Sequence, residues 1–261
     1  MEFELRELTT GYRSSQRQHI VATKITAQLR AGELTCLLGP NGAGKSTLLR
    51  TLAAFQPALG GEMLLDGQPL DSYTTQQLAM RLGIVLTERP DIKGMRVREM
   101  VAMGRSPYTG FWGRLTADDE TTVEEAIHQV GIEELEHRMV HTLSDGERQK
   151  VMIAKVLAQQ TPIIFLDEPT AFLDFPSKVE MMLLLRRLAH EMQKTVFLST
   201  HDLELALQTA DRLWLMAKGQ PIVIGTPSEL ASSGALPRFF SGPGITFDAD
   251  GLRFKIHTYN T

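Results

Sequence analysis

The sequence predicts an α/β fold in which a mostly parallel β-sheet is covered by helices on both faces. Three observations support this prediction. A glycine-rich loop joins an apolar strand to a helix at 37–49, strand and helix patterns alternate after residue 160, and residues 97–160 follow helical spacing without a strand. We therefore expect one domain of 261 residues, with a sheet core at 1–95 and 161–261 and a helical insert at 96–160.

Alternating apolar and polar residues in the N-terminal third predict an antiparallel β subdomain. "FELREL" and "HIVATKITAQL" fit two half-buried strands that are joined by a polar turn around Ser14, Ser15 and Gln16. "ELTCLL" fits a short buried strand, and "KSTLLRTLAA" fits a helix. The strand region "GEMLLDGQPL" contains a turn at Asp66 and Gly67, and a short helix then leads to the strand "RLGIVL".

Strands and helices alternate in the C-terminal part, which predicts parallel pairing with helices on both sides of the sheet. The strands are "IIFLD", "TVFLS", "RLWLM" and "PIVIG". Two intervening helices each place four apolar side chains on one face: Met181, Leu184, Leu185 and Leu188 in the first, and Leu203, Ala206, Leu207 and Ala210 in the second. The tail "GITFDADGLRFKI" fits a hairpin with its turn at Asp250 and Gly251.

Composition excludes several classes of function. The formal net charge of −4 gives no overall basic field, so we expect no nucleic-acid partner. Cys36 is the one cysteine, which rules out an internal disulfide framework and a cysteine-built zinc site, and inside an apolar strand it fits a small buried hydrophobe. No stretch approaches the roughly 20 apolar residues that span a bilayer, and residues 1–20 lack a signal-peptide core, so we expect a cytoplasmic chain.

The loop in "LLGPNGAGKSTLL" fits the phosphate-binding pattern G-x-x-x-x-G-K-[ST], flanked by a strand and a helix as that motif requires. Its backbone N–H groups can converge on phosphate oxygens, and the following helix points its positive end at the same anion. Lys45 would neutralise β- and γ-phosphate charge, and the Ser46 hydroxyl would bind Mg²⁺. This predicts a nucleoside triphosphate site in a P-loop NTPase core. The predicted site residues are Gly39, Pro40, Asn41, Gly42, Ala43, Gly44, Lys45, Ser46 and Thr47.

Two carboxylates end the apolar strand in "IIFLDEP", where a buried acid is unfavourable unless a positive group lies nearby. Asp167 suits a metal ligand that acts on Mg²⁺ through water, and Glu168 suits the general base for an attacking water. His201, in "VFLSTHD", follows an apolar strand at the same edge of the predicted sheet, where it can contact the γ-phosphate and hold the water. The candidate catalytic residues are therefore Glu168, His201 and Lys45.

The stretch "LSDGERQKVMIAKVLAQ" contains the capping box Ser144-x-x-Glu147, which predicts the start of an amphipathic helix. An exposed helix N-terminus with the Ser144 hydroxyl and the Gly146 amide is also an anion receptor. One chain already has its phosphate loop, so we expect this second receptor to serve a nucleotide held by another copy. The receptor residues are Leu143, Ser144, Asp145, Gly146 and Glu147.

The ordered motifs "GPNGAGKST", "LSDGE", "IIFLDEPT", "AFLD" and "STHD" resemble those of ATP-binding cassette (ABC) ATPases over essentially the whole chain. The resemblance implies a RecA-like nucleotide-binding core with an antiparallel β subdomain and an inserted helical subdomain, which binds and hydrolyses ATP with Mg²⁺. It also implies a homodimer in which two copies clasp two ATP molecules head to tail, with Asp174 at the junction. Tyr12 matches the aromatic residue on which this family stacks adenine.

Residues 97–119, "VREMVAMGRSPYTGFWGRLTADD", are similar to the ATPases of iron-chelate, haem and cobalamin importers, which carry a G-R-x-P-aromatic stretch at this point. This similarity implies two integral membrane permease subunits, an extracytoplasmic substrate-binding protein that acts indirectly, and a peripheral place on the cytoplasmic face of the cell (inner) membrane. The cargo stays open among siderophore, haem and cobalamin, because the other subunits contact it.

Three positions depart from the family pattern. Thr87, followed by Glu88, stands where the family has a glutamine that contacts Mg²⁺ and the membrane subunit. A threonine is shorter and cannot offer both amide groups, so direct metal coordination by Thr87 is doubtful. Asp145 replaces the signature's third glycine, and because its charge would repel a γ-phosphate we expect its side chain to point away. Glu147 replaces a glutamine found in many relatives, which its capping role explains.

Alternatives to an iron-chelate or cobalamin importer include the ATPase of another importer and three further classes. An ABC protein that acts on ribosomes or DNA carries two cassettes in tandem or long coiled-coil arms, and neither pattern occurs in these residues. A P-loop small-molecule kinase or GTPase is disfavoured by the paired acids Asp167 and Glu168, by the Ser144 signature and by the lack of an N-K-x-D guanine motif. An export ATPase usually carries its membrane spans in the same chain.

Overall fold

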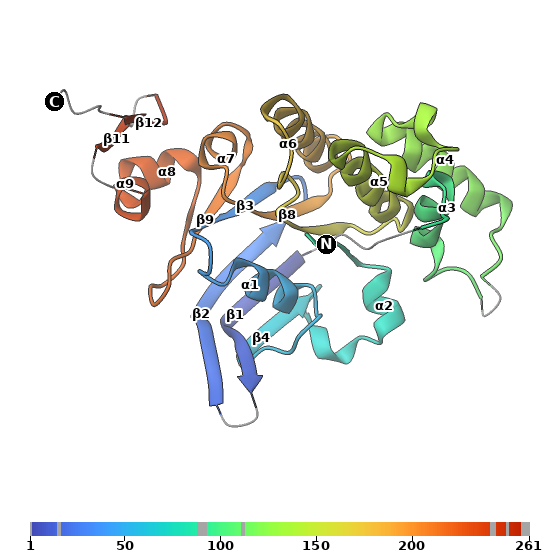
Figure 1. Cartoon of the computed structure of the whole chain (residues 1–261). Coiled ribbons are helices and arrows are strands. Elements are labelled where there is room, and N and C mark those ends of the chain that lie inside the picture. Colours follow the sequence, from blue (N-terminus) through green and yellow to red (C-terminus); the bar gives the residue numbers. More distant parts are fainter. Residues whose placement is uncertain are drawn as a thin grey trace.

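A computed structural model describes residues 2–14, 17–87, 93–110, 113–240, 244–248 and 251–256. Ser15 and Gln16 of the first predicted turn, Glu88, and Asp250 of the last predicted turn lie outside these ranges. Within them, the chain forms two main sheets, a helical insert and a small C-terminal hairpin (Figure 1). None of the described helices is both long and apolar enough to cross a bilayer.

The central sheet has six strands in the order β10-β9-β3-β8-β7-β6. They are β3 (Leu34–Leu38), β6 (Leu82–Val85), β7 (Ile163–Asp167), β8 (Thr195–Thr200), β9 (Arg212–Leu215) and β10 (Val223–Gly225). The predicted parallel pairing is confirmed for all of them except β10, which turns back antiparallel onto β9. Because the carboxyl ends of β3, β7 and β8 meet at one edge, the loops that follow these strands share one region of the surface.

Alternate side chains of the central strands enter two separate apolar cores. On β7, Ile164 points to the face covered by α6 (Phe175–His190) and α7 (Leu203–Thr209), whereas Phe165 points to the face covered by α1 (Lys45–Leu52) (Figure 1). The helices therefore cover both faces of the sheet, as the alternation of strands and helices predicted.

Cys36 and the helices α6 and α7 test the burial that the sequence predicted. Cys36 is fully buried, and this burial raises the pKa of its thiol, which fits the predicted small hydrophobe. The predicted face of α7 packs on the core along its length, but Leu203 and Ala210 at its ends are only partly buried, and Ala210 has extended backbone where the chain turns toward β9. The side chains that α7 buries are Leu205, Ala206 and Leu207. The predicted face of α6 is confirmed, because the structure buries Met181, Leu184, Leu185 and Leu188.

The N-terminal sheet is antiparallel, as predicted, with strands in the order β2-β1-β4-β5. Its strands are β1 (Glu2–Ser14), β2 (Arg17–Arg30), β4 (Gly60–Leu65) and β5 (Gln68–Pro69). Asp66 and Gly67 form the predicted turn between β4 and β5 with φ angles of 51° and 76°, the left-handed backbone that a two-residue hairpin turn requires. Phe3 of β1 packs edge-on against Phe165, which joins this sheet to the central one.

The insert between the two halves of the central sheet is helical, and no strand occurs in its described residues from 97 to 158. Its elements are α3 (Val97–Ala102), η2 (Met103–Arg105), α4 (Ala117–Val130), η3 (Glu133–Leu135), η4 (Val140–Thr142) and α5 (Asp145–Ala158). Helices α3 and α4 lie beside α5 at one end of the molecule (Figure 1). Their apolar side chains join the same core as α6, so the insert packs directly on the sheet domain.

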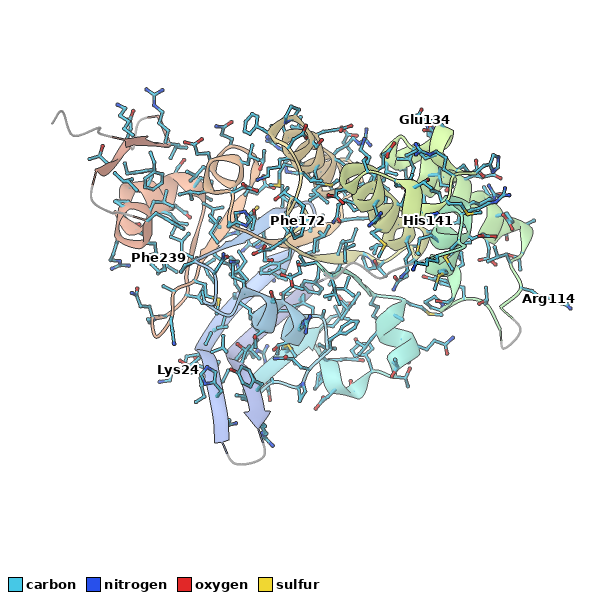
Figure 2. All side chains as sticks on the ribbon, in the orientation of Figure 1. Lys24, Arg114, Glu134, His141, Phe172 and Phe239 are labelled. Atoms are coloured by element: carbon cyan, nitrogen blue, oxygen red, sulfur yellow. The ribbon has the colours of Figure 1, made fainter. Side chains whose placement is uncertain are left out.

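The remaining short elements lie at the edges of these layers. They are η1 (Leu70–Ser72), α2 (Thr75–Ala79), α8 (Pro227–Ser232), α9 (Ala235–Phe240), β11 (Ile245–Asp248) and β12 (Arg253–Ile256). Strands β11 and β12 pair antiparallel and confirm the predicted C-terminal hairpin. Phe247 and Phe254 pack together in this hairpin, and Phe239 of α9, labelled in Figure 2, packs with them against the main core.

Candidate functional site

The glycine-rich loop connects β3 to α1 and has the backbone that a phosphate cradle requires. Gly42 and Gly44 have φ angles of 77° and 103°, the left-handed region that favours glycine. A side chain at Gly39 would lie 2.2 Å from the backbone oxygen of Met216, so this position also excludes any larger residue. Helix α1 begins at Lys45, directly after the loop, and its N-terminal N–H groups face the same space.

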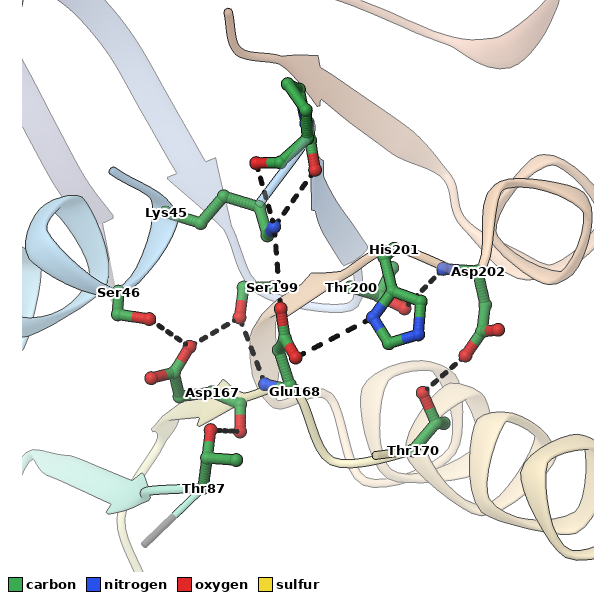
Figure 3. A network of polar contacts seen from close by, with 12 residues as sticks. Lys45, Ser46, Thr87, Asp167, Glu168, Thr170, Ser199, Thr200, His201 and Asp202 are labelled. Carbon is green, nitrogen blue, oxygen red and sulfur yellow. Dashed lines mark hydrogen bonds and ion pairs between the residues drawn. The ribbon is translucent and has the colours of Figure 1, made fainter. Parts of the chain in front are cut away.

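Lys45 is almost fully buried, and its amine lies between the loop and a carboxylate (Figure 3). Its Nζ donates hydrogen bonds to the backbone oxygens of Gly39 at 2.9 Å and Pro40 at 3.4 Å. The Oε1 atom of Glu168 lies 3.4 Å from the same Nζ. A buried ammonium with a carboxylate partner can transfer its contacts to the oxygens of an incoming phosphate, because both are anionic acceptors.

Ser46 and Asp167 place two oxygen ligands side by side. The Ser46 hydroxyl donates to Oδ1 of Asp167 at 3.1 Å, and the Ser199 hydroxyl donates to the same oxygen at 2.6 Å. Among the described residues, no group of three or more histidine, cysteine or acidic side chains could enclose a metal. A hydroxyl and one carboxylate fit Mg²⁺, which keeps several waters and takes its other ligands from substrate phosphates.

Glu168 follows Asp167 but faces a different direction, because its backbone has a φ of 49°. Its N–H is held by Ser199 of β8, with the backbone oxygen at 3.2 Å and the hydroxyl oxygen at 3.0 Å. Its carboxylate lies between the side chains of Lys45 and His201: Oε2 is 3.6 Å from Nδ1 of His201, opposite the contact with Lys45. The two adjacent acids therefore occupy different parts of the site.

Thr87, two residues after β6, reaches the same site from its other side (Figure 3). Its hydroxyl donates a hydrogen bond of 2.7 Å to the backbone oxygen of Asp167. The threonine therefore holds the end of β7 rather than presenting its proton-bearing group to solvent. This contact supports the view that Thr87 is not a direct metal ligand.

Tyr12 lies at the outer rim of the loop, half exposed, on β1. Its ring stacks on that of His19, its partner across the β1–β2 ladder, with 4.8 Å between the centroids and 29° between the planes. One pocket is lined by Tyr12, His19, most of the glycine-rich loop and Glu168. An exposed aromatic face beside a phosphate cradle can stack a planar base.

Ser144 is the N-cap of α5, and the predicted capping box is confirmed. The N–H of Glu147 donates to the Ser144 hydroxyl oxygen at 3.3 Å, and the Ser144 N–H donates to Oε2 of Glu147 at 2.7 Å. The hydrogen bonds from Ser144 lower the pKa of the Glu147 carboxyl. That the Asp145 side chain points away from a bound γ-phosphate stays a prediction.

The signature residues open onto a second pocket. That pocket is lined by residues 144–147 together with Asp174, and it shares no residue with the pocket over the glycine-rich loop. The Asp174 side chain accepts a hydrogen bond of 3.1 Å from the N–H of Ser177 and so caps α6, and the contacts with Ser177 lower the pKa of this carboxyl. Phe172, labelled in Figure 2, lies on this face with 70% of its surface exposed. The two anion receptors of one chain therefore belong to different pockets.

Three residues that we did not predict from the sequence, Asp202, Thr170 and Lys178, hold the loop after β8 against the loop after β7 and the start of α6. Asp202, next to His201, accepts hydrogen bonds from the Thr170 hydroxyl at 2.8 Å and from Nζ of Lys178 at 2.9 Å. The histidine is thereby anchored through its neighbour. The pattern "STHD" contains Asp202, but nothing in its spacing indicates which side chains it meets.

Comparisons with known proteins agree with this geometry. A family model described as "ABC transporter" matches residues 22–171, which is more than half of the chain. The chain is 36% identical to the ferric enterobactin transport ATP-binding protein FepC of Escherichia coli, with 90% of this chain and 85% of that protein covered. It is 38% identical to the hemin import ATP-binding protein HmuV of Streptomyces coelicolor, with 85% and 79% covered.

Solved structures show the same likeness. The chain superposes on cbiO1 of Clostridium perfringens, described as part of an ABC transporter complex, with a TM-score of 0.77, 30% identity, and coverage of 90% and 92% of the two chains. It superposes on the dimeric ABC transporter cassette MJ0796 with a TM-score of 0.74, 25% identity, and coverage of 86% and 98%. These neighbours share the arrangement of a sheet core, an antiparallel sheet and a helical insert.

Proposed function

The chain belongs to the ABC transporter family of ATP-binding proteins, and from this membership we propose that it powers the import of an iron chelate. The chain is an ATPase subunit. The observation that supports hydrolysis at this site is the convergence of Lys45, Asp167, Glu168 and His201 on the carboxyl edge of β3, β7 and β8. Relatives are named for the transport of ferric enterobactin, iron(3+)-hydroxamate and hemin, which favours a siderophore or haem over cobalamin as the cargo.

The residues of the loop would bind the triphosphate of ATP. Backbone N–H groups of the loop and of the start of α1 would donate to phosphate oxygens, and Lys45 would exchange its contact with Glu168 for the β- and γ-phosphates. Tyr12 would stack the adenine. Ser46, with Asp167 acting through water, would hold Mg²⁺, which neutralises charge that develops on the phosphates.

Glu168 would act as the general base. Lys45 would move to the phosphates, which leaves the carboxylate free to accept a proton from the attacking water. His201 would hold that water and the γ-phosphate in line. Most of the rate in phosphoryl transfer comes from such positioning and from charge neutralisation rather than from covalent chemistry.

We infer that the site is completed by a second copy. The signature residues 144–147 line a different pocket from the loop of the same chain, so they are available to a nucleotide bound elsewhere. A homodimer would join the loop of one copy to Ser144 and the Gly146 amide of the other, with Asp174 at the junction. Two permease subunits would hold the pair peripherally at the cytoplasmic face of the cell membrane, and an extracytoplasmic binding protein would deliver the cargo.

Uptake by the intact complex tests this proposal. The chain would be expressed with its own permease subunits, reconstituted in vesicles, and supplied with ATP and a loaded binding protein. We expect ATP-dependent uptake of a ferric siderophore or of haem, and none when Glu168→Gln replaces the wild-type chain. Uptake of cobalamin alone would contradict the cargo class, and uptake that continues with Glu168→Gln would contradict the hydrolytic site.

A further inference from the structure

The G-R-x-P-aromatic stretch forms a buried polar cluster away from the nucleotide site. Arg105 is only 6% exposed, and its guanidinium makes three hydrogen bonds. Nε donates to Oδ1 of Asp119 in α4 at 2.8 Å, and Nη1 donates to the backbone oxygen of Ala158 at 2.8 Å and to Oε1 of Gln160 at 2.9 Å. One side chain therefore joins the start of α4 to the C-terminal end of α5.

Gly104 and Tyr108, on either side of Arg105, pack the G-R-x-P-aromatic stretch closely against α5. A side chain at Gly104 would lie 2.1 Å from the backbone oxygen of Lys155, so only glycine allows this approach. The Tyr108 hydroxyl donates to the backbone oxygen of Gln159 at 2.9 Å, and the ring lies 4.0 Å from the Arg105 guanidinium. These contacts satisfy carbonyl groups that the end of a helix leaves without intrahelical partners.

The end of α5 is also tied to the sheet core. Nε2 of Gln159 donates to the backbone oxygens of Ala79 at 2.5 Å and Leu82 at 3.3 Å, at the start of β6. Nε2 of Gln76 in α2 donates to the backbone oxygen of Pro107 at 2.9 Å. We call the set formed by Arg105, Tyr108, Asp119, Gln159 and Gln160 the Arg105 joint. It holds the insert, the end of α5 and the core together at one point.

A buried ion pair is weak evidence for stability, because desolvation offsets most of the attraction. The planar guanidinium of Arg105, however, donates in fixed directions, so it fixes the position of its partners in a way that an apolar contact would not. Helix α5 spans 14 residues, and Ser144 caps its other end. At a length of about 20 Å, a tilt of roughly 3° at the joint would move Ser144 by about 1 Å.

We propose that Arg105 is a positioning residue: the Arg105 joint fixes the tilt of α5 against the core and thereby places Ser144 on the γ-phosphate of a nucleotide held by a second copy. This inference rests on the proposed sharing of the site between two copies. Arg105 acts through α5 and does not touch the nucleotide, so its effect belongs to the assembled pair and not to ATP binding by one chain.

Arg105→Lys tests the proposal, because lysine keeps the charge but donates from a single point and cannot bridge α4 and α5. We expect kcat for ATP hydrolysis to fall at least about tenfold, since a displacement of 1 Å can cost about a hundredfold in rate. The Kd of a single chain for ATP, measured with a fluorescent analogue at protein concentrations too low for the dimer, should stay within about twofold. In a Glu168→Gln background, we expect the ATP concentration that gives half-maximal dimer to rise at least about tenfold, measured by size-exclusion chromatography with light scattering.

Arg98→Lys is the matched control. Arg98 lies in the same insert, and its guanidinium binds three carboxylates within that insert, those of Glu120, Glu124 and Glu136. We expect its kcat and its ATP requirement for the dimer to stay within about twofold of wild type. Equal losses in the two variants, or a loss of single-chain ATP affinity as large as the loss of kcat, would mean a general loss of structure and would overturn the proposal.

Two further variants keep the test decisive. Tyr108→Phe removes the hydrogen bond to Gln159 and leaves the partly exposed ring in place. If Arg105→Lys does not fold, we expect this variant to lower kcat about two- to fivefold at constant single-chain affinity for ATP. A wild-type kcat for Tyr108→Phe would then overturn the proposal. Ser144→Ala distinguishes a failure of the Arg105 joint from a failure of the shared site. If Ser144→Ala raises the ATP requirement for the dimer and Arg105→Lys does not, the joint has no positioning role. If neither variant raises it, the proposed sharing of the site between two copies is wrong.

Discussion

At the scale of single residues, Glu168 stands out because its backbone and its side chain are both constrained. A left-handed φ of 49° is rare for a residue with a Cβ atom and costs on the order of 1–3 kcal/mol. Two hydrogen bonds from its N–H to Ser199 hold this conformation. This backbone conformation turns the carboxylate away from Asp167 and toward Lys45 and His201, which separates the acid that we propose to hold Mg²⁺ from the acid that we propose as the base.

Glu168→Gln should reduce ATP turnover by at least about a hundredfold, because the amide cannot accept the proton of the attacking water. The size and the backbone preference are nearly unchanged, so we expect ATP to bind with its wild-type affinity. Phosphate release and fluorescent-nucleotide binding would measure the two effects. Turnover at the wild-type rate would exclude Glu168 as the base, and loss of binding together with turnover would indicate damage to the loop instead.

Ser199→Ala should reduce kcat and stability together. The substitution removes a hydrogen bond of 2.6 Å from a buried oxygen of Asp167 and one of the two acceptors for the Glu168 N–H. Leaving such a group short of a partner costs on the order of 1–3 kcal/mol. Urea unfolding and a Mg²⁺ titration of ATPase activity would show the loss, with Ser232→Ala as a control because its hydroxyl donates to a backbone oxygen within α8, far along the chain from the site. Identical results for the two variants would contradict the role of Ser199.

The chemistry of the site could be predicted from the sequence, but its supporting contacts could not. Lys45, Asp167 and His201 belong to motifs with fixed spacing at the ends of apolar strands, so their meeting at one sheet edge follows from parallel pairing. Ser199 supports the site only because its position in β8 is paired with Asp167 in β7. That register depends on packing across the sheet, and a sequence pattern does not fix it.

At the scale of elements, Asp119 in the first turn of α4 both caps its own helix and binds Arg105. The Asp119 carboxylate accepts hydrogen bonds from the N–H and hydroxyl of Thr116, which close a capping box, and from Nε of Arg105 in the joint. The contacts with the Thr116 backbone and with Arg105 lower the pKa of Asp119 to about 2. The start of α4 and the end of α5 therefore depend on the same negative charge.

Asp119→Asn should change how stability depends on pH. Because the folded pKa is about 2 and the usual value is 3.8, ionised Asp119 stabilises the fold fully above about pH 4, and this contribution is lost as the pH falls toward 2. The variant should be less stable at pH 7 and should lose less stability between pH 5 and 2.5. Urea unfolding across this range measures both, with the exposed neighbour Asp118→Asn expected to keep the wild-type profile. Parallel profiles for wild type and Asp119→Asn would contradict the prediction.

Helix length explains why the predicted apolar face is fully buried in α6 but only partly buried in α7. Over the 16 residues of α6, the period of 3.6 repeats enough times that the four predicted side chains are all buried. Helix α7 has only 7 residues, so Leu203 at its start and Ala210 just beyond its end contact the core but stay partly exposed. Its end at Thr209 is set by the start of β9, a tertiary constraint that lies outside the local pattern.

At the scale of the whole molecule, the insert and the sheet core share one apolar cluster. Val97 and Val101 of α3 belong to the same cluster as Ile164 of β7 and Leu185 of α6. The change of pattern at residue 97 predicted the insert, but it could not reveal that the packing is continuous, because this depends on how α5 lies against the sheet. The signature at the start of α5 therefore belongs to a helical insert that packs directly against the sheet whose strands position the candidate site.

The separation of the two anion receptors leads to a prediction for mixed dimers. A chain with Lys45→Ala lacks the phosphate ligand, and a chain with Ser144→Arg blocks the signature, so each variant alone should be inactive. A twofold dimer of the two together contains one site with an intact loop and an intact signature, and one site with neither. Random pairing of equal amounts makes half of the dimers mixed, so we expect about one quarter of wild-type activity, if the two sites act independently.

Phosphate release from the 1:1 mixture, compared with each variant alone at the same total concentration, measures this restoration. The activity should also fall on dilution more steeply than the protein concentration, because the active species forms from two chains. A mixture as inactive as its components, together with wild-type activity that is strictly proportional to concentration, would mean that one chain holds a complete site. In that case, the two pockets of the chain would have to close on the same nucleotide, which their separate linings argue against.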